Sequence, residues 1–201
     1  MKPNFIRRFV PCGIRCTIVS ALIGAHTAGA ADVTWDTAAG DSGATGGDGT
    51  WNLTLSKWTT DAGVSNRNWV NANHDTAVFG LSLGTVTLGT GISVGGLTFD
   101  DAYTLAGSTL TFGASGAITA NADAEIASGI AGAPSVTITK TGLAKLTLTG
   151  TSTHTGTLEV QAGLLVLGHP TSTLADTAPV LVSGGTLKVA NPDTVGTVTM
   201  S

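Results

Sequence analysis

The sequence predicts an all-β fold in which short strands stack as a solenoid, and three observations support this prediction. First, 28 of the 201 residues are glycine and 34 are threonine, whereas only 11% are charged. Second, short apolar stretches with a two-residue period recur between glycines from Val86 onward. Third, the apolar template of residues 158–168 recurs at residues 180–190. The scarcity of long-chain helix formers disfavours a helical bundle or a doubly wound α/β fold, and the 42% hydrophobic content disfavours disorder.

Residues 1–30 have the layout of a secretory signal peptide. Four basic residues and no acidic one precede an apolar run from Ile18 to Ala25, and Ala28-Gly29-Ala30 follows it. The uncharged stretch is shorter than the ~20 residues of a membrane-spanning helix, which disfavours an N-terminal anchor. We therefore predict a signal peptide at 1–30 and an exported protein located outside the cell or on its surface.

Charge and cysteine content restrict the partners and the chemistry of the mature chain. Cleavage after Ala30 leaves five basic and thirteen acidic residues, a net charge of −8. Nucleic acid is therefore not an expected partner, because its binding depends on Lys and Arg contacts to phosphate. Both cysteines, Cys12 and Cys16, lie in the predicted signal peptide, so no disulfide is expected. The mature fold must depend on apolar burial and backbone hydrogen bonds.

Residues 31–85, which we name the N-terminal cap, differ in composition from the rest. They contain every tryptophan of the chain and a glycine-rich loop at Gly40–Gly49. Large aromatic side chains can cover the open end of a stacked sheet, which would otherwise present unpaired strand edges. We expect this packing role, with sugar stacking as the alternative, for Trp35, Trp51, Trp58 and Trp69.

Residues 86–201 are predicted to form the solenoid. Each predicted strand is short, alternates apolar and polar residues, and is bounded by glycine or turn residues. The predicted strands are Val86–Leu88, Leu97–Phe99, Tyr103–Leu105, Leu110–Phe112, Val136–Ile138, Leu146–Leu148, Leu158–Val160, Leu165–Leu167, Val180–Val182 and Leu187–Val189.

Internal repetition favours a solenoid over a sandwich. When residues 158–168 are aligned with 180–190, Leu158 matches Val180 and Leu165 matches Leu187. Glycine recurs at the corner between the two apolar pairs, as Gly163 and Gly185, where it allows a positive φ. A single rung of this kind cannot bury its apolar face, whereas stacked rungs form a continuous core.

Residues 140–168 (KTGLAKLTLTGTSTHTGTLEVQAGLLVLG) resemble the autotransporter-associated, or passenger-associated, β-strand repeat of bacterial secreted proteins. The departures are Ala144, Thr149 and His154, which stand where that repeat has Gly, Ser and an aromatic residue. Weaker similarity extends over residues 48–190. The matching positions are Lys140, Gly142, Leu146, Leu148, Gly150, Thr155, Gly156, Val160, Gly163, Leu165, Leu167 and Gly168.

The resemblance implies a right-handed parallel β-helix in the passenger of an autotransporter-like or cell-surface protein. In such proteins the repeat is thought to help export and folding, and the resemblance does not imply an enzyme. The segment from Leu187 to Ser201 is too short for the translocating barrel of this secretion type. We therefore expect a structural, adhesin-like module, as part of a larger protein or as a small complete one. Expected partners are surface glycans, host or matrix surfaces, and a second copy paired through the terminal rung.

The alternative function is a carbohydrate-binding or polysaccharide-cleaving β-helix. Carboxylates close in sequence are Asp100 with Asp101, and Asp123 with Glu125, and the second pair would share one face of a strand. Two such carboxylates could flank a glycosidic bond. Arg67 is the single arginine of the mature chain that could act as a lyase base. Because surface carboxylates are common, we predict no catalytic residues.

No cofactor or metal site is predicted. The Gly40–Gly49 loop is rich in Gly and Asp but matches neither the EF-hand nor the calcium-binding nonapeptide pattern. His74, His154 and His169 do not show the spacing of zinc ligands.

Overall fold

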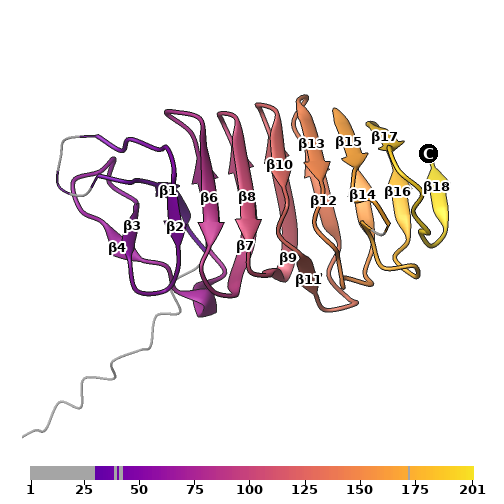
Figure 1. The fold of residues 1–201 in the computed structure, drawn as a ribbon, viewed down its shortest axis with the longest axis horizontal. Coiled ribbons are helices and arrows are strands. Elements are labelled where there is room, and N and C mark those ends of the chain that lie inside the picture. The colour runs from indigo at the N-terminus through magenta and orange to yellow at the C-terminus, as the bar shows by residue number, and fades with distance from the viewer. Residues whose placement is uncertain (1–29, 39, 41–42, 172) are drawn as a thin grey trace, which may run out of the picture.

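The computed structural model describes residues 30–38, 40, 43–171 and 173–201, so the predicted signal peptide lies outside the described residues except for Ala30. The described chain is a parallel β-solenoid of about 6 turns, which confirms the predicted fold class. Its strands stack along the long axis, from the N-terminal cap in indigo to the C-terminus in yellow (Figure 1). One short 3₁₀ helix, η1 (Asn71–Asn73), is the only helix among the described residues.

Two sheets form the walls of the solenoid. The first sheet contains β1 (Asp32–Trp35), β3 (Ser56–Thr59), β4 (Arg67–Asn68), β5 (Thr76–Phe79), β7 (Ile92–Phe99), β9 (Leu110–Ala120), β11 (Ile130–Gly132), β12 (Ile138–Thr141), β14 (Leu158–Val160), β16 (Val180–Val182) and β18 (Val198–Met200). The second sheet contains β2 (Gly49–Trp51), β6 (Gly84–Leu88), β8 (Tyr103–Gly107), β10 (Ala124–Ile126), β13 (Lys145–Leu148), β15 (Leu164–Leu167) and β17 (Thr186–Val189).

The register of the strands follows the repeat in the sequence. Leu158 of β14 pairs with Val180 of β16, and Leu165 of β15 pairs with Leu187 of β17, which confirms the alignment of residues 158–168 with 180–190. Inward positions of most strands are apolar and many outward ones are threonine, as in β6, where Val86 is buried and its outward neighbours are exposed. Stacking therefore places residues of the same kind above one another, and the inward side chains form a continuous apolar core.

One predicted strand lies at the wrong place. The segment predicted at Val136–Ile138 is a strand only from Ile138, because a turn at Pro134 and Ser135 precedes it and the Val136 N–H bonds back to the Ala133 carbonyl. The strand is β12, which continues to Thr141 and pairs with β9. The prediction also lacked β10, β11 and β18, and it lacked the first half of β7 and the second half of β9.

The N-terminal cap combines parallel and antiparallel pairing. β1 pairs in parallel with β5, and β2 with β6, so the parallel ladders begin before residue 86. β3 and β4 instead pair antiparallel, β3 on β1 and β4 on β3, at the indigo end of the molecule (Figure 1). All four tryptophans are buried there, which confirms the packing interpretation. The ring centroids of Trp51 and Trp58 lie 4.6 Å apart, and those of Trp58 and Trp69 lie 4.8 Å apart.

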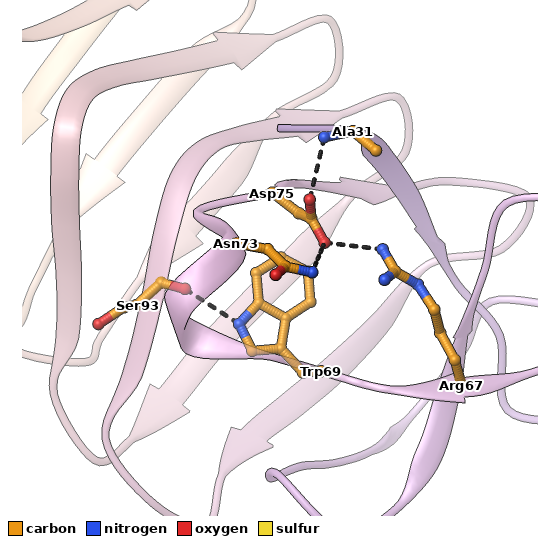
Figure 2. Close-up of polar contacts among 6 residues, drawn as sticks. All are labelled: Ala31, Arg67, Trp69, Asn73, Asp75 and Ser93. Atoms are coloured by element: carbon orange, nitrogen blue, oxygen red, sulfur yellow. Dashed lines mark hydrogen bonds and ion pairs between the residues drawn. The ribbon is translucent and has the colours of Figure 1, made fainter. Parts of the chain in front are cut away.

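A polar cluster links elements within the N-terminal cap (Figure 2). The buried Asp75 carboxylate accepts hydrogen bonds from the Ala31 N–H at 3.0 Å and from Arg67 Nη2 at 2.7 Å. Asn73 Nδ2 lies 3.4 Å from the same oxygen as Arg67. Beside this cluster, the indole N–H of Trp69 donates to the Ser93 carbonyl at 3.0 Å, so the aromatic cluster is tied to β7. The cluster therefore joins β1, β4 and η1.

A buried lysine joins two corners of the solenoid. Lys140 occupies an inward position of β12 and is fully buried. Its ammonium group donates to three carbonyl oxygens, those of Thr141 at 2.8 Å, Gly142 at 2.7 Å and Ala162 at 3.0 Å. Ala162 belongs to the next rung, so the side chain links adjacent corners. Glycine is required at position 163, directly after Ala162. Its φ is +66°, and a Cβ there would lie 2.6 Å from the Gly142 carbonyl oxygen.

Replacing Lys140 with methionine is expected to lower the free energy of unfolding by about 1–3 kcal/mol, because three carbonyls lose a charged donor while the apolar stem is kept. Burial lowers the pKa of the Lys140 ammonium below its ordinary value of 10.5. Between the lowered pKa and 10.5 the unfolded chain therefore binds more protons than the folded one, and stability rises with pH. Urea unfolding of both proteins at several pH values in this interval should show the free energy of unfolding of the wild type rising relative to that of Lys140→Met. A pH-independent difference would contradict this assignment.

Candidate functional site

The outer face of the second sheet carries a row of polar side chains parallel to the solenoid axis. Thr85 of β6, Thr104 of β8, Glu125 of β10 and Thr147 of β13 are successive register partners. Because each residue points outward and parallel strands lie about 4.8 Å apart, hydroxyl and carboxylate groups repeat at that interval. Alternation within each strand turns these residues outward, since the neighbouring residues face the core. The register between strands then aligns them in a row.

A second row lies beside it and contains an ion pair. The Asp123 carboxylate accepts a hydrogen bond from the Lys145 N–H at 2.9 Å, and its other oxygen lies 3.1 Å from Lys145 Nζ. The backbone hydrogen bond from Lys145 is the main reason that the pKa of Asp123 lies below its ordinary value. Both side chains are well exposed, at 60% for Asp123 and 45% for Lys145. This pair therefore positions charge on the surface and contributes little to stability.

The two rows line an open groove with a cavity volume of about 350 Å³. At its N-terminal end, the Asp48 carboxylate accepts a hydrogen bond from the Thr85 N–H at 2.6 Å. Tyr103 contributes to the lining, and its buried hydroxyl accepts from the Gly47 N–H at 2.7 Å and donates to the Gly80 carbonyl. Burial raises the pKa of this phenol above its ordinary value of 10.0. The tyrosine thus fixes the loop that carries Asp48.

The groove confirms that Asp123 and Glu125 share one face. Glu125 Oε1 accepts a hydrogen bond from the Thr149 hydroxyl at 2.6 Å. Cleavage of a glycosidic bond requires one carboxyl whose pKa is raised, so that it can donate a proton. The pKa of Asp123 is shifted in the opposite direction. Asp123 is therefore not suited to donate that proton. The groove offers hydrogen-bond acceptors, hydroxyls and one ammonium group, a set that suits binding of a hydroxylated ligand.

The other sequence candidates lie elsewhere. Asp100 accepts a hydrogen bond from Asn121 Nδ2, which lies 21 residues further along the chain, so this contact joins adjacent rungs. Asp101 accepts one from the Ala102 N–H and supports a local turn. Arg67, the candidate lyase base, is paired with Asp75 in the N-terminal cap and does not line the groove.

The histidines are also separate from one another. His74 ends η1 in a left-handed conformation, and His169 lies in the loop between β15 and β16. His154 is buried, and it lines a small interior cavity together with Ser152 and apolar residues. Among the described residues, no group of three or more His, Cys, Asp or Glu side chains could hold a metal ion. The part of the chain that the structure describes contains no helix long and apolar enough to span a membrane.

Sequence reasoning singled out two groove residues, Asp123 and Glu125, and overlooked the others. Asp123 and Lys145 are separated by the same spacing as Leu158 and Val180, so this ion pair could have been derived from the register of the repeat. Asp48 and Tyr103 gave no such signal. Their positions depend on the loop between β1 and β2 and on the Gly47 hydrogen bond, which no periodicity encodes.

Comparison with known proteins found one relevant similarity. The chain is 40% identical over 151 residues, or 72% of its length, to the adhesin BmaC autotransporter of Brucella suis biovar 1 (strain 1330). The aligned region spans about 4% of that much longer protein. This similarity and the β-solenoid fold are consistent with the resemblance to autotransporter-associated repeats. No family model matches the chain, and no solved structure matches it.

Proposed function

We propose that this chain is a non-enzymatic, passenger-type module of an exported bacterial surface protein, and that it is part of a longer protein. The observation that carries the proposal is the 40% identity over 151 residues to an adhesin autotransporter. The stacked rungs support it, because a solenoid folds through neighbouring contacts that can form one rung at a time. Such folding suits a chain that emerges progressively from a membrane.

In this proposal the module supports export and folding, and its outer face contributes to adhesion. Export in an unfolded state suits a chain without disulfides. None is expected here, because Cys12 and Cys16 both lie in the predicted signal peptide. The outward threonines present hydroxyl groups on extended faces that suit contact with glycans or with host and matrix surfaces. The adhesive surface would lie outside the cell.

Surface labelling tests the proposal. Antibodies raised against the purified chain should label intact cells of the source bacterium, and protease added outside the cells should remove the label. Deleting the coding region for residues 86–201 should reduce attachment of these cells to host or matrix surfaces. Labelling that requires permeabilised cells would refute the assignment.

The groove favours a second candidate function, which is binding of a glycan. Its carboxylate oxygens and hydroxyls could accept and donate hydrogen bonds to sugar hydroxyls, and Glu125 lies in the middle of the polar row. Glu159 provides a matched control on the first sheet, because it also accepts one hydroxyl hydrogen bond, from Ser183 at 2.7 Å.

For this second function, Glu125→Gln is expected to weaken binding on a glycan array at least about tenfold, the effect of a polar group left unmatched in a binding site. Glu159→Gln should leave binding unchanged. Equal loss in both variants would exclude the groove as the binding site, and release of shortened glycan by the wild type would contradict the non-enzymatic proposal.

A further inference from the structure

The two oxygens of the buried Asp75 carboxylate have donors of different charge. The side chain is 3% exposed, and its Oδ2 lies 2.7 Å from the cationic Arg67 Nη2. Its Oδ1 accepts a hydrogen bond at 3.0 Å from the main-chain N–H of Ala31, 44 residues earlier (Figure 2). Charged donors bind a carboxylate more strongly than neutral ones do. A positive charge at the Ala31 nitrogen would therefore strengthen the second contact of Asp75.

The Ala31 nitrogen is also the predicted N-terminus of the mature chain. Ala28-Gly29-Ala30 precedes it, and the sequence predicts cleavage by a signal peptidase after Ala30. Hydrolysis breaks the Ala30–Ala31 peptide bond: the hydroxyl of water joins the Ala30 carbonyl carbon, and the Ala31 nitrogen takes the proton of that water and the proton of the new carboxyl group. The neutral amide thus becomes an α-ammonium group, whose ordinary pKa is about 8.

We propose that this α-ammonium group forms an ion pair with Asp75, so that removal of the signal peptide completes the N-terminal cap. The inference rests on the proposed function, because it requires export with cleavage after Ala30. In the mature chain each oxygen of Asp75 binds one cation, the α-ammonium group on Oδ1 and Arg67 on Oδ2. The uncleaved chain makes the first contact with a neutral donor, so its cap is less stable.

Main-chain hydrogen bonds that cleavage leaves unchanged hold both groups in place. The Ala31 carbonyl accepts from the Thr76 N–H at 2.8 Å, and the Asp75 carbonyl accepts from the Gly95 N–H at 2.9 Å. Because both groups are already ordered, the pair costs little conformational entropy. Ala30 is exposed and lines a surface cavity of about 360 Å³. The other protons of the ammonium group therefore stay in contact with water.

The charges around Ala31 favour an added cation. Asp32 follows Ala31 on β1 and is exposed, and Asp75 faces Ala31 from the segment after η1. Arg67 on β4 is 38% exposed, so water screens its repulsion of the ammonium group. His74 is the titratable residue among those that line the cavity with Ala30. With the α-ammonium group, two cations balance the two carboxylates.

Two forms of the mature chain that differ only at the Ala31 nitrogen test the pair. Residues 31–201 are produced once with a free α-amine and once with this amine acetylated. The free form should unfold at a thermal midpoint about 2–4 °C higher, the shift of a chain of this length for a moderate gain in stability. Tryptophan fluorescence follows the cap, because all four tryptophans are buried there. Equal midpoints of the two forms at neutral pH would overturn the proposal.

The difference between the two forms should depend on pH. Pairing with Asp75 raises the pKa of the α-ammonium group in the folded chain above its ordinary value of about 8 in the unfolded chain. The stabilisation is therefore complete below about pH 7 and is lost as the pH rises past the raised value. Titration of His74 affects both forms and cancels in the difference. A difference that stays unchanged at about pH 11 would exclude the ionised amine as its cause.

Substitution of the carboxylates identifies the partner of the amine. Asp75→Asn keeps the shape of the acceptor and removes its charge, so the free and acetylated forms of this variant should unfold at the same midpoint. Asp32→Asn is the matched control, because Asp32 is adjacent to Ala31 but exposed, and its two forms should differ as the wild-type forms do. A difference that persists in Asp75→Asn, or that disappears in Asp32→Asn, would overturn the pair. The comparison of the wild-type forms needs no substitution, so it decides alone if Asp75→Asn does not fold.

N-terminal sequencing of the chain recovered from outside the cells of the source bacterium tests the processing step. We expect Ala31 as the first residue. An exported chain that begins at another residue would overturn this inference and leave the export proposal intact. A chain that is found only inside the cells and still carries residues 1–30 would refute both. The two midpoints would show independently whether Asp75 binds an α-ammonium group.

Discussion

Replacing Trp58 with alanine is expected to lower the free energy of unfolding by about 3–5 kcal/mol, the cost of removing a large buried aromatic side chain. Trp58 lies at the centre of the aromatic cluster of the N-terminal cap and is 0% exposed. Its ring centroid lies 5.2 Å from that of Trp35 and 4.6 Å from that of Trp51. It lies 5.6 Å from Phe79, which connects the cluster to the first rung.

The loss should affect the cap before the solenoid. In a stacked protein each rung is stabilised by its neighbours, so weakening one end separates the unfolding of that end from the rest. Urea unfolding of Trp58→Ala should therefore show tryptophan fluorescence changing at lower urea than circular dichroism. Val64→Ala is the control, because Val64 lies in the same cap at 70% exposure, and its effect should stay within about 0.5 kcal/mol. A loss below about 1 kcal/mol in Trp58→Ala would contradict the central role of this ring.

The sequence was most informative where two independent patterns agree. The strands β14 to β17 were predicted with their register because apolar alternation and a constant repeat spacing coincide there. β10 was not predicted, because one of its two inward residues is the small Ala124, which adds little to an apolar alternation, whereas β14, of the same length, has Leu158 and Val160 there. Its pairing comes from strands on either side, which a local pattern does not record.

The candidate groove was only partly predictable for a related reason. Along its outer row, the sequence spacing from Thr85 to Thr104 is shorter than the spacing from Glu125 to Thr147. Because the first rungs are shorter, one fixed offset cannot align the N-terminal residues with the later ones. Alternation placed Asp123 and Glu125 on one face, but the position of Asp48 depends on rung length and on the loop before β2.

The buried residues of the cap could also be predicted only in part from the sequence. The concentration of tryptophans predicted an aromatic core, and all four rings are buried. The polar contacts beside them could not be predicted, because Arg67 lies in β4 and Asp75 follows η1, and the two become neighbours only when these segments fold onto the start of β1. Arg67 was considered as a lyase base for its chemistry, whereas its position makes it a structural residue.

Replacing Asp75 with alanine is expected to lower the free energy of unfolding by about 3 kcal/mol, because one partner of a largely buried ion pair is removed. The side chain of Asp75 is 3% exposed and that of Arg67 is 38% exposed, at a distance of 2.7 Å. Three donors lose their acceptor together, since the Ala31 N–H and the Asn73 amide bind the same carboxylate. Guanidinium chloride unfolding of the wild type and the variant measures this loss.

The second ion pair of the described chain provides the matched control. Asp123 and Lys145 lie 3.1 Å apart, but their side chains are 60% and 45% exposed, so Asp123→Ala should cost at most about 1 kcal/mol. Two double-mutant cycles in urea, one for Arg67 with Asp75 and one for Asp123 with Lys145, would separate pair coupling from other losses. Added salt should reduce the coupling of the exposed pair and change that of the buried pair little, because burial limits screening. Equal couplings at every salt concentration would show that burial does not strengthen the Arg67–Asp75 contact, and the cap would then depend on its aromatic core alone.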